Sequence, residues 1–251
     1  FNNNNVVNNN EGGKLENNGD LNNNSSLKND GELENKGTVS NNENGNLENN
    51  GTIDNKENAE INNGGNFNNN AGSTLNNESG AKIDGSQPIS NGGDINNDGN
   101  IKTTVENTED GKVDAEVTWT DKDGNEHSGS LKDVLEYLKE NPEEASGAKV
   151  ELNKDVEVTE PLEVPSGVEL SVPEDKKLSI GENGKLSVDE GAELSVEEGG
   201  SVEVKPEGTL DNNGTVSVGE GGSLDNNGTV NNNEGGTLKN DGTFNNNNVV
   251  N

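Results

Sequence analysis

The residues that could perform chemistry begin with a short acidic run near the middle of the chain. Asp121, Asp123 and Asn125 have the D-x-D-x-N spacing with which a calcium-binding loop opens. Such a loop also needs glycine at its sixth position and glutamate at its twelfth. Instead, Gly124 lies between the candidate ligands and Lys132 stands twelfth. The pattern therefore favours a hairpin turn over a metal site.

The other candidate metal ligands are isolated. The segment GGDINNDGN (92–100) is similar to the nonapeptide of calcium β-rolls, but Ile95 occupies its fourth position, where glycine is required. His127 is the single histidine of a chain without cysteine, so we interpret it as a polar residue beside a turn. We predict no metal site and no cofactor. Weak, diffuse binding of divalent cations by so acidic a chain stays open.

Paired carboxylates are the remaining candidates for catalysis. Glu143 and Glu144 fall at the end of an expected helix, and exposure to water accounts for them. Glu197 and Glu198 fall in an expected turn. Acid–base catalysis by two carboxylates needs a cleft that perturbs their pKa values, whereas the carboxylates here are spread over the whole chain. We therefore predict no catalytic residue and expect that the chain is not an enzyme.

Several asparagines match the N-x-[ST] acceptor pattern for glycosylation. In a chain this rich in asparagine such matches arise by chance, and they matter only if the source glycosylates secreted proteins. Threonine is scattered, not arranged in the regular Thr-x-Thr rows of an ice-binding face. The matching residues are Asn23, Asn24, Asn50, Asn77, Asn213 and Asn227.

The composition limits the fold and the partners. Of 251 residues only 24% are hydrophobic and 2% aromatic, and the net charge is −32, values typical of disordered chains. All 17 basic residues are lysine, and a chain this acidic is a poor partner for nucleic acid or anionic lipid. No apolar run is long enough to span a membrane, and there is no cysteine for disulfides. Neither a signal peptide nor an initiating methionine is present, as expected of a mature form, a fragment or a recombinant piece.

The aliphatic residues recur at fixed intervals, which argues for ordered repeats instead of disorder. From Val7 to Ile101 each member of the series follows the previous one by six or eight positions, and the same intervals return from Leu170 to Val250. Even intervals keep these side chains on one face of a strand, whereas a helix needs intervals of three and four. Asn-Gly dipeptides, which favour tight turns, stand between them, as in LENNGD (15–20).

Short strands joined by such turns predict a β-solenoid. Three sides of roughly 6 to 8 residues give coils of about 18–24 residues. We predict an all-β fold, a right-handed parallel β-helix, in which each coil buries few side chains, so that little apolar material suffices. Asparagines at equivalent corners are expected to stack into amide ladders at the ~4.8 Å strand spacing.

Residues 102–147 interrupt the pattern and contain the only Trp, Tyr and His. KVDAEVTWTDKDGNEHSG (112–129) predicts two strands joined by a turn at 121–125. SLKDVLEYLKENP (130–142) predicts an amphipathic capping helix, because apolar residues recur at i, i+3, i+4 and i+7, and Ser130 with Asp133 resembles a capping box. We therefore expect three regions, which are an Asn-rich solenoid (1–101), a hairpin with the capping helix (102–147) and a second solenoid (148–251).

Three stretches carry a resemblance to known families. WTDKDGNEHSGSLKDVLEYLKE (119–140), followed by AKVELNKDVEVTEPLEVPSGVELSV (148–172), resembles the start of β-helix modules in bacterial surface proteins with pectate-lyase-like folds. In those modules an amphipathic helix covers the first coil. GTLDNNGTVSV (208–218) resembles the stalk repeats of filamentous haemagglutinin-like and autotransporter adhesins. The resemblance implies a surface fibre and identifies no ligand.

The octet FNNNNVVN occurs twice, as Phe1–Asn8 and as Phe244–Asn251. Overlapping the two octets keeps the intervals of six or eight positions from Leu238 through to Leu15 of a following copy. Because Phe244 repeats Phe1, the pattern would recur every 243 positions. Two hypotheses follow. The chain is one unit of a tandem array in a longer fibrous protein, or it is a subunit that stacks head to tail on further copies.

The sequence thus predicts a structural protein of an extracellular or cell-surface fibre, a stalk or a matrix filament, whose coils continue end to end into copies of itself. Its dense negative charge should keep fibres from bundling laterally, and salt should weaken that repulsion. The alternative is a glycan-binding adhesin module with Trp119 or Tyr137 as contact residue. A polysaccharide-active enzyme and a designed solenoid without biological role are further alternatives.

Overall fold

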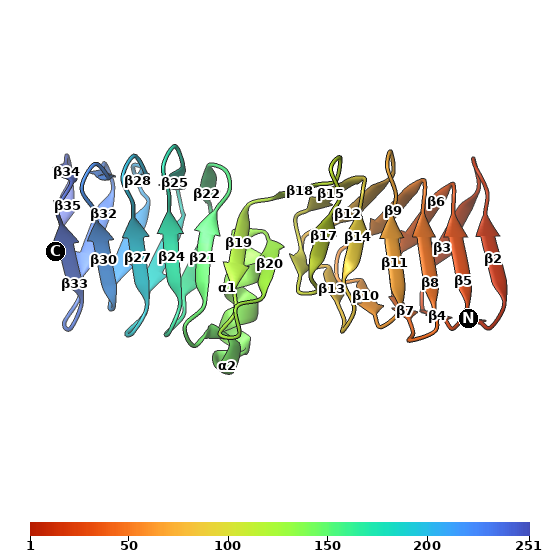
Figure 1. Ribbon diagram of the computed structural model, residues 1–251. Helices are drawn as coiled ribbons and strands as arrows, with labels where there is room; N and C mark the ends of the chain where they lie inside the picture. The colour runs from red at the N-terminus through yellow and green to blue at the C-terminus, as the bar shows by residue number, and fades with distance from the viewer. The chain divides into compact units, whose positions relative to one another are not determined.

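The computed structural model describes every residue of the chain, Phe1–Asn251, and divides into two compact bodies. The first comprises Phe1–Ala115 with Glu126–Asp133, and the second comprises Glu116–Asn125 with Val134–Asn251. Each body is a stack of three-sided coils built almost entirely of short parallel strands (Figure 1). The prediction of an all-β parallel β-helix with a small helical insert is confirmed.

The first body has six coils, and each coil gives one strand to each of three parallel sheets. The first sheet contains β1 (Asn2–Asn3), β4 (Asp20–Asn23), β7 (Thr38–Asn41), β10 (Glu60–Asn63), β13 (Lys82–Asp84) and β16 (Asn100–Ile101). The second contains β2 (Val6–Asn9), β5 (Ser26–Asn29), β8 (Asn46–Asn49), β11 (Asn66–Asn69), β14 (Ile89–Asn91) and β17 (Val105–Asn107). The third contains β3 (Lys14–Asn17), β6 (Glu32–Asn35), β9 (Thr52–Asn55), β12 (Thr74–Asn77), β15 (Asp94–Asn97) and β18 (Lys112–Ala115).

The second body has five coils of the same kind. Its first sheet contains β21 (Lys149–Leu152), β24 (Glu169–Val172), β27 (Glu193–Val196), β30 (Thr215–Val218) and β33 (Thr237–Asn240). The second contains β22 (Val156–Val158), β25 (Lys177–Ile180), β28 (Ser201–Val204), β31 (Ser223–Asn226) and β34 (Thr243–Asn246). The third contains β23 (Pro161–Val164), β26 (Lys185–Val188), β29 (Thr209–Asn212), β32 (Thr229–Asn232) and β35 (Val249–Val250).

The insert is smaller than the sequence pattern indicated. The first solenoid runs on past residue 101, because β17 pairs with β14 and β18 pairs with β15. Lys112–Ala115 is therefore a solenoid strand and not the first strand of a hairpin. The insert itself contains β19 (Val117–Thr120), β20 (Glu126–Gly129), α1 (Leu131–Glu140) and the short α2 (Pro142–Ala145). The helix expected at 130–142 is confirmed.

Stacked coils keep strict register although their lengths differ. Leu27 pairs with Leu47, and Leu47 pairs with Phe67 at the same interval. Ile61 pairs with Ile83, which is an interval longer by two positions. The differences are even and fall in the corners, so the alternation of inward and outward side chains is never broken.

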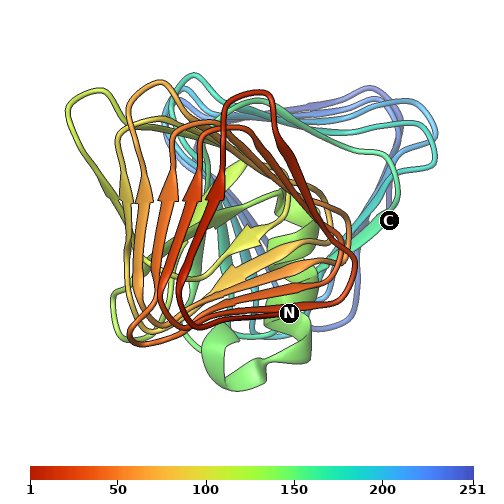
Figure 2. The same ribbon diagram turned by 90° about the vertical axis from the view of Figure 1, so that its right-hand side faces the viewer.

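The solenoid of the first body is right-handed, as predicted. Seen from the end that carries the N-terminus, its coils turn clockwise as they recede (Figure 2). Right-handed crossovers are the rule between parallel strands of one sheet, because a right-twisted strand returns to its sheet most easily in that sense.

The core of the first body is a set of single-file aliphatic rows. Each side of a coil contributes one apolar side chain, and those from Leu21 to Ile101 are at most 2% exposed. Except for Ile101 in the last coil, each of these side chains is stacked between its counterparts in the coils before and after it. A chain with few hydrophobic residues can therefore build a continuous core, because each coil needs only three of them.

Three ladders of buried asparagine amides run along the first body, one at the end of each sheet's strands. In one ladder Asn29 Nδ2 donates to Asn49 Oδ1 at 2.8 Å, and Asn49 Nδ2 donates to Asn69 Oδ1 at 2.8 Å. The second hydrogen of Asn29 Nδ2 is donated across the corner to the Thr52 carbonyl at 2.8 Å. The amide thus fixes both the stacking of coils and the bend between two sides. The predicted Asn ladders are confirmed, with members Asn3, Asn23, Asn41 and Asn63; Asn9, Asn29, Asn49, Asn69, Asn91 and Asn107; Asn17, Asn35, Asn55, Asn77 and Asn97.

Glycine follows these asparagines because the corners of stacked coils nearly touch. A Cβ added to Gly51 would lie 2.1 Å from the Gly31 carbonyl oxygen, and one added to Gly37 would lie 2.2 Å from that of Gly19. No side chain fits at that distance. The Asn-Gly pairs of the sequence therefore report close approach of backbones as well as turn geometry.

The second body uses valine or isoleucine at most of the equivalent positions and returns to asparagine in its last coils. Val188 pairs with Asn212, whose Nδ2 then donates to Asn232 Oδ1 at 2.7 Å. Val204 pairs with Asn226, whose Nδ2 donates to Asn246 Oδ1 at 2.8 Å. The wider apolar interior of the early coils therefore gives way to the same polar ladder that the first body has.

Replacing one ladder amide should cost far more than replacing its neighbour on the same strand. Asn69 is fully buried, donates to Asn91, and accepts from Asn49 and from the Ser73 hydroxyl. We expect Asn69→Ala to lower the free energy of unfolding by about 2–4 kcal/mol, because buried donors lose their acceptor. Asn68→Ala, at the adjacent outward position, should change it by less than about 0.5 kcal/mol. Urea titrations of both variants measure the difference, and equal losses would contradict the role given to the ladder.

Candidate functional site

The insert supplies a cap to the last coil of the first body. β20 pairs antiparallel with β16, setting Asn100 opposite Gly129. Asn97, the last member of its ladder, donates through Nδ2 to the Ser128 carbonyl at 2.8 Å and to the Ser128 hydroxyl at 3.1 Å. Ser128 of the insert therefore accepts the hydrogen bonds of Asn97 Nδ2 that an asparagine of a further coil would otherwise accept. This strand closes the solenoid instead of extending it.

The start of α1 is held by the same body. Ser130 Oγ accepts from the Asp133 backbone N–H at 3.1 Å, as the capping motif predicts. The Asp133 carboxylate accepts from the Gly80 N–H at 2.8 Å, and the Ser130 N–H donates to the Gly99 carbonyl at 3.0 Å. The reciprocal half of the predicted capping box is thus replaced by contacts to solenoid corners.

The rest of α1 and β19 cover the first coil of the second body. β19 pairs antiparallel with β21, opposing Trp119 to Val150. Trp119 is fully buried, and its ring centroid lies 5.8 Å from that of Tyr137 on the helix. Leu135 and Leu138 of the helix are also buried. Trp119 is therefore core, and its indole has no exposed face on which a sugar could stack.

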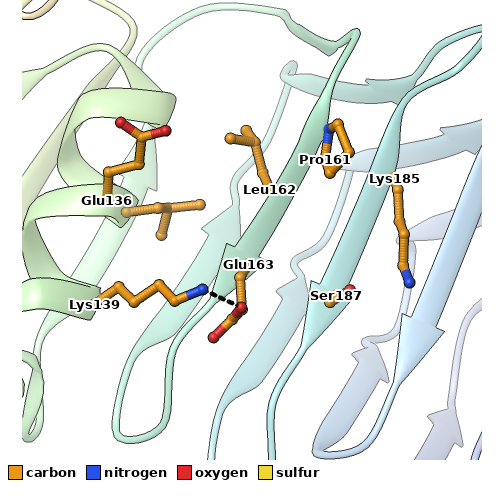
Figure 3. A pocket seen from close by; sticks show the side chains of 8 residues that line it. Glu136, Lys139, Pro161, Leu162, Glu163, Lys185 and Ser187 are labelled. Carbon is orange, nitrogen blue, oxygen red and sulfur yellow. Dashed lines mark hydrogen bonds and ion pairs between the residues drawn. The ribbon is translucent and has the colours of Figure 1, made fainter.

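A small hollow of the second body lies between α1 and the sheet edge beneath it. Its volume is about 250 Å³, below the range of about 300–1,000 Å³ usual for ligand sites. Figure 3 shows Lys139 reaching from the helix toward Glu163, which lies on the same strand, β23, as Leu162. The lining residues are Leu135, Glu136, Lys139, Pro161, Leu162, Glu163, Lys185 and Ser187.

Both lysines of this hollow form ion pairs, one of them with a carboxylate that also lines the hollow. Lys139 Nζ lies 2.5 Å from Glu163 Oε2 (Figure 3), and Lys185 Nζ lies 2.6 Å from Asp211 Oδ2. Burial, together with the neighbouring Glu163 carboxylate, raises the pKa of Asp189 to about 6. The hydrogen bond from Asp189, with a smaller effect of Lys139, holds the pKa of Glu163 below its usual range. The cluster can therefore take up a proton in the mildly acidic range.

A second hollow, of about 500 Å³, marks the end of another ladder in the first body. Asn63 has no asparagine above it, because Gly85 takes that place, and its Nδ2 donates to the Gln87 and Pro88 carbonyls at 3.0 and 3.2 Å. The walls are polar corner residues, with Glu43 the one charged group. The hollow is an interruption of the repeat whose amide donor is already satisfied.

The structure places the sequence-derived metal candidates in local roles. Asp121 Oδ1 accepts from the backbone N–H groups of Asp123 and Asn125, both at 2.9 Å, and Gly124 has a φ of +85°. These residues form the tight turn that was expected. His127 lies within β20, two residues after this turn, and is buried. No group of three or more His, Cys, Asp or Glu side chains is arranged to hold a metal ion.

The remaining candidates are scattered. Glu143 and Glu144 lie in α2, and Glu197 follows β27 at a corner. The charged cluster at Glu163 was not predicted. The one signal for it in the sequence is the separation of Lys139, Glu163 and Asp189 by about one coil length. Among the N-x-[ST] asparagines, those buried in the ladders are Asn23 and Asn77, and those exposed include Asn24 and Asn50.

Comparisons with known proteins give little. No protein-family model matches the chain, and no curated protein matches it. Among solved structures, the chain is similar to the crystal structure of a TibC-catalysed, hyper-glycosylated fragment of TibA, residues 55–350. The two are 17% identical, with 99% of this chain and 98% of that chain covered, at a TM-score of 0.22. So low a score carries no argument. No helix in the structure is long and apolar enough to cross a membrane.

The Asp189 carboxyl should make the second body's stability depend on pH. In the folded protein its pKa is about 6, against an ordinary value of 3.8, so between these values the folded state holds a proton that the unfolded chain releases. The cost of burying this group therefore falls as the pH drops from 7.5 to 5. Asp189→Asn, neutral at every pH, should raise the melting temperature at pH 7.5 by about 2–4 °C and by clearly less at pH 5.

The matched control is Asp241→Asn, an exposed aspartate of the last coil. Its melting temperature should follow that of the parent at both pH values. Circular dichroism melts of the three proteins measure the effect. If Asp189→Asn raised the melting temperature equally at pH 5 and pH 7.5, protonation of Asp189 would not explain the effect.

Proposed function

We propose that the chain is a structural segment of an extracellular or cell-surface fibre, a stalk or matrix filament, whose solenoid is extended by coils added end to end into further copies of itself. The observation that supports this proposal is the position of the duplicated octet. In Phe1–Asn8 a strand (β1) is followed by a corner and the start of the next strand (β2), and in Phe244–Asn251 the end of β34 is followed by a corner and β35. An identical segment thus occupies the first coil of one body and the last coil of the other.

The two octets also agree residue by residue in which way they face. Asn3 and Asn246 both occupy ladder positions, since Asn3 donates to Asn23 and Asn246 accepts from Asn226. The second valine of each octet lies at a core position, because Val7 pairs with Leu27 and Val250 with Val230. The first valine of each octet lies at an outward position, where Val6 pairs with Ser26 and Val249 with Thr229. Because the last coil repeats the first coil in this detail, the strand that follows the first coil could also follow the last one.

The surface fits a passive, extended role. Outward positions carry acidic, amide and hydroxyl groups, and exposed ladders such as Asn4, Asn24 and Asn42 line the corners. The net charge of −32 favours solubility and lateral repulsion. A glycan-binding role through Trp119 has no support, because that side chain is buried. That the chain is not an enzyme stays a prediction.

Polypeptides of one, two and four copies that share their octets should form rods whose length grows in equal steps. Residues 1–251 followed by residues 9–251 give the two-copy chain. The rods should show a meridional reflection at about 4.8 Å, because strands lie perpendicular to the solenoid axis. Electron microscopy measures the lengths and fibre diffraction the spacing. Beads on flexible strings, with no growth in stiff length, would contradict the proposal. Filaments formed by the one-copy chain would indicate that copies also join without a covalent link.

Salt should control how such rods associate side by side. At 20 mM NaCl the Debye length is about 20 Å and acidic faces repel, whereas at 500 mM it is below about 5 Å. We expect single four-copy rods at low salt and bundles at high salt. A few millimolar Mg²⁺ should promote bundling as strongly as a much higher concentration of Na⁺. Light scattering across the titration measures bundling. Bundles that are already present at 20 mM and do not change would show that charge is not what separates the rods.

A further inference from the structure

We infer that the last coil of the chain is built to be continued across a shared octet by residue 9 onward of a second copy, so that β33 of one copy lies beside β3 of the next. This inference rests on the proposed function and specifies how two copies of the chain are joined. The partner surface is therefore a second copy of this chain's own third strand, and the two octets are one element and not two elements in contact.

The pairings on both sides of the shared octet are already present in the structure. At its second occurrence the octet lies on the preceding coil, with β34 paired to β31 and β35 paired to β32. At its first occurrence it lies under the following coil, with β1 paired to β4 and β2 paired to β5. Superposing the octets therefore gives a segment with a complete coil on each side.

The core closes in the same way. Phe1 is 68% exposed and Phe244 is half-buried, because each has a coil on one side only. Phe67, which has coils on both sides, is fully buried. In the joint one phenylalanine has Leu224 before it and Leu21 after it, much as Phe67 lies between Leu47 and Ile89.

The amide ladder passes through the joint without a change of direction. Asn226 Nδ2 donates to Asn246 Oδ1 at 2.8 Å, and Asn3 Nδ2 donates to Asn23 Oδ1 at 2.8 Å. A single asparagine in the shared octet both accepts and donates, as every interior ladder member does. A joint between two C-terminal coils would set donor against donor, and a joint between two N-terminal coils would set acceptor against acceptor.

The one new pairing is β33 with β3, and its side chains are complementary. Leu15 of the second copy follows Leu238 at the same interval that separates the stacked residues Leu47 and Phe67. This register sets leucine on leucine at the core position. It also sets Lys239 beside Glu16 on the outer face.

The ladder position agrees as well. Asn240 ends β33 and Asn17 ends β3, so the register aligns their amides at the corner. Asn17 already donates to Asn35 at 2.7 Å, which leaves its Oδ1 to accept from Asn240. Three matched pairs on one strand, one apolar, one ionic and one amide, therefore favour this contact.

Stacking the first octet of one copy on the last octet of another would interrupt the solenoid. In a right-handed solenoid the strand after β35 returns to the side of β33 and lies on it. A separate copy that set its β1 on β34 and its β2 on β35 would skip that side and leave β33 uncovered. Coincident octets leave no such gap.

The test uses the two-copy chain, residues 1–251 followed by residues 9–251, which contains no cysteine of its own. Thr237→Cys in the first copy and Lys14→Cys in the second stand opposite each other in the inferred register, within disulfide reach for neighbouring strands. Thr243→Cys in the first copy with the same Lys14→Cys is the matched control, because those residues lie on different sides of the coil. We expect roughly tenfold more intramolecular disulfide in the first pair after mild oxidation, measured by non-reducing electrophoresis and peptide mass spectrometry.

Hydrogen exchange at the octet amides distinguishes a wrong β33–β3 register from coils that do not continue at all. Slow exchange together with a disulfide between positions 237 and 14 supports the inference. Slow exchange with the disulfide in the control pair, or in neither, overturns the β33–β3 register and leaves the fibre function standing. Fast exchange at the octet, in a chain whose two copies are otherwise folded, shows that the coils do not continue and overturns both.

Discussion

A buried primary amide must find partners for two donors and an acceptor, and the first solenoid is organised around that requirement. An asparagine in the interior of a ladder gives one hydrogen to the next amide and the other to a backbone carbonyl, as Asn29 does toward Asn49 and Thr52. An unsatisfied amide in this position would cost more than a core methylene gains. The coils are therefore locked in register by polar groups, while the aliphatic rows supply the bulk of the burial.

The ladder also explains why the coil length can vary and the register cannot. The coil from Val39 to Ile61 is longer than the coil from Leu21 to Val39. The extra residues lie in the corners, where they do not disturb the pairing of the strands. A change by a single residue would move both the aliphatic row and the amide to the solvent side. The second body relaxes the demand by placing Val188 and Val204 at ladder positions, and its early coils accordingly need more apolar sequence.

Caps and open coils are treated differently in this chain. Where the first body stops, Ser128 accepts the last amide donor of its ladder, and where the second body starts, α1 and Trp119 cover its core. The coils that contain the octet have no such cover, and Phe1 and Val250 are exposed there. The charged cluster at Glu163 belongs to the cap, where a helix lies against a sheet edge and both burial and a like charge act on the neighbouring aspartate.

The periodic part of the fold could be predicted from the sequence, because strand alternation, Asn-Gly turns and helix periodicity each depend on residues close in the chain. It did not determine where the first solenoid ends, since Val105 joins through pairing with an earlier coil and lacks the Asn-Gly signal. The burial of Trp119 and His127 could not be predicted from the sequence, because it follows from the pairing of β19 with β21 in one body and of β20 with β16 in the other. The pairing of Lys139 with Glu163 likewise follows from a helix that crosses a strand far away in the chain. Contacts that repeat are encoded locally, whereas contacts that end the repeat join distant residues and leave no local pattern.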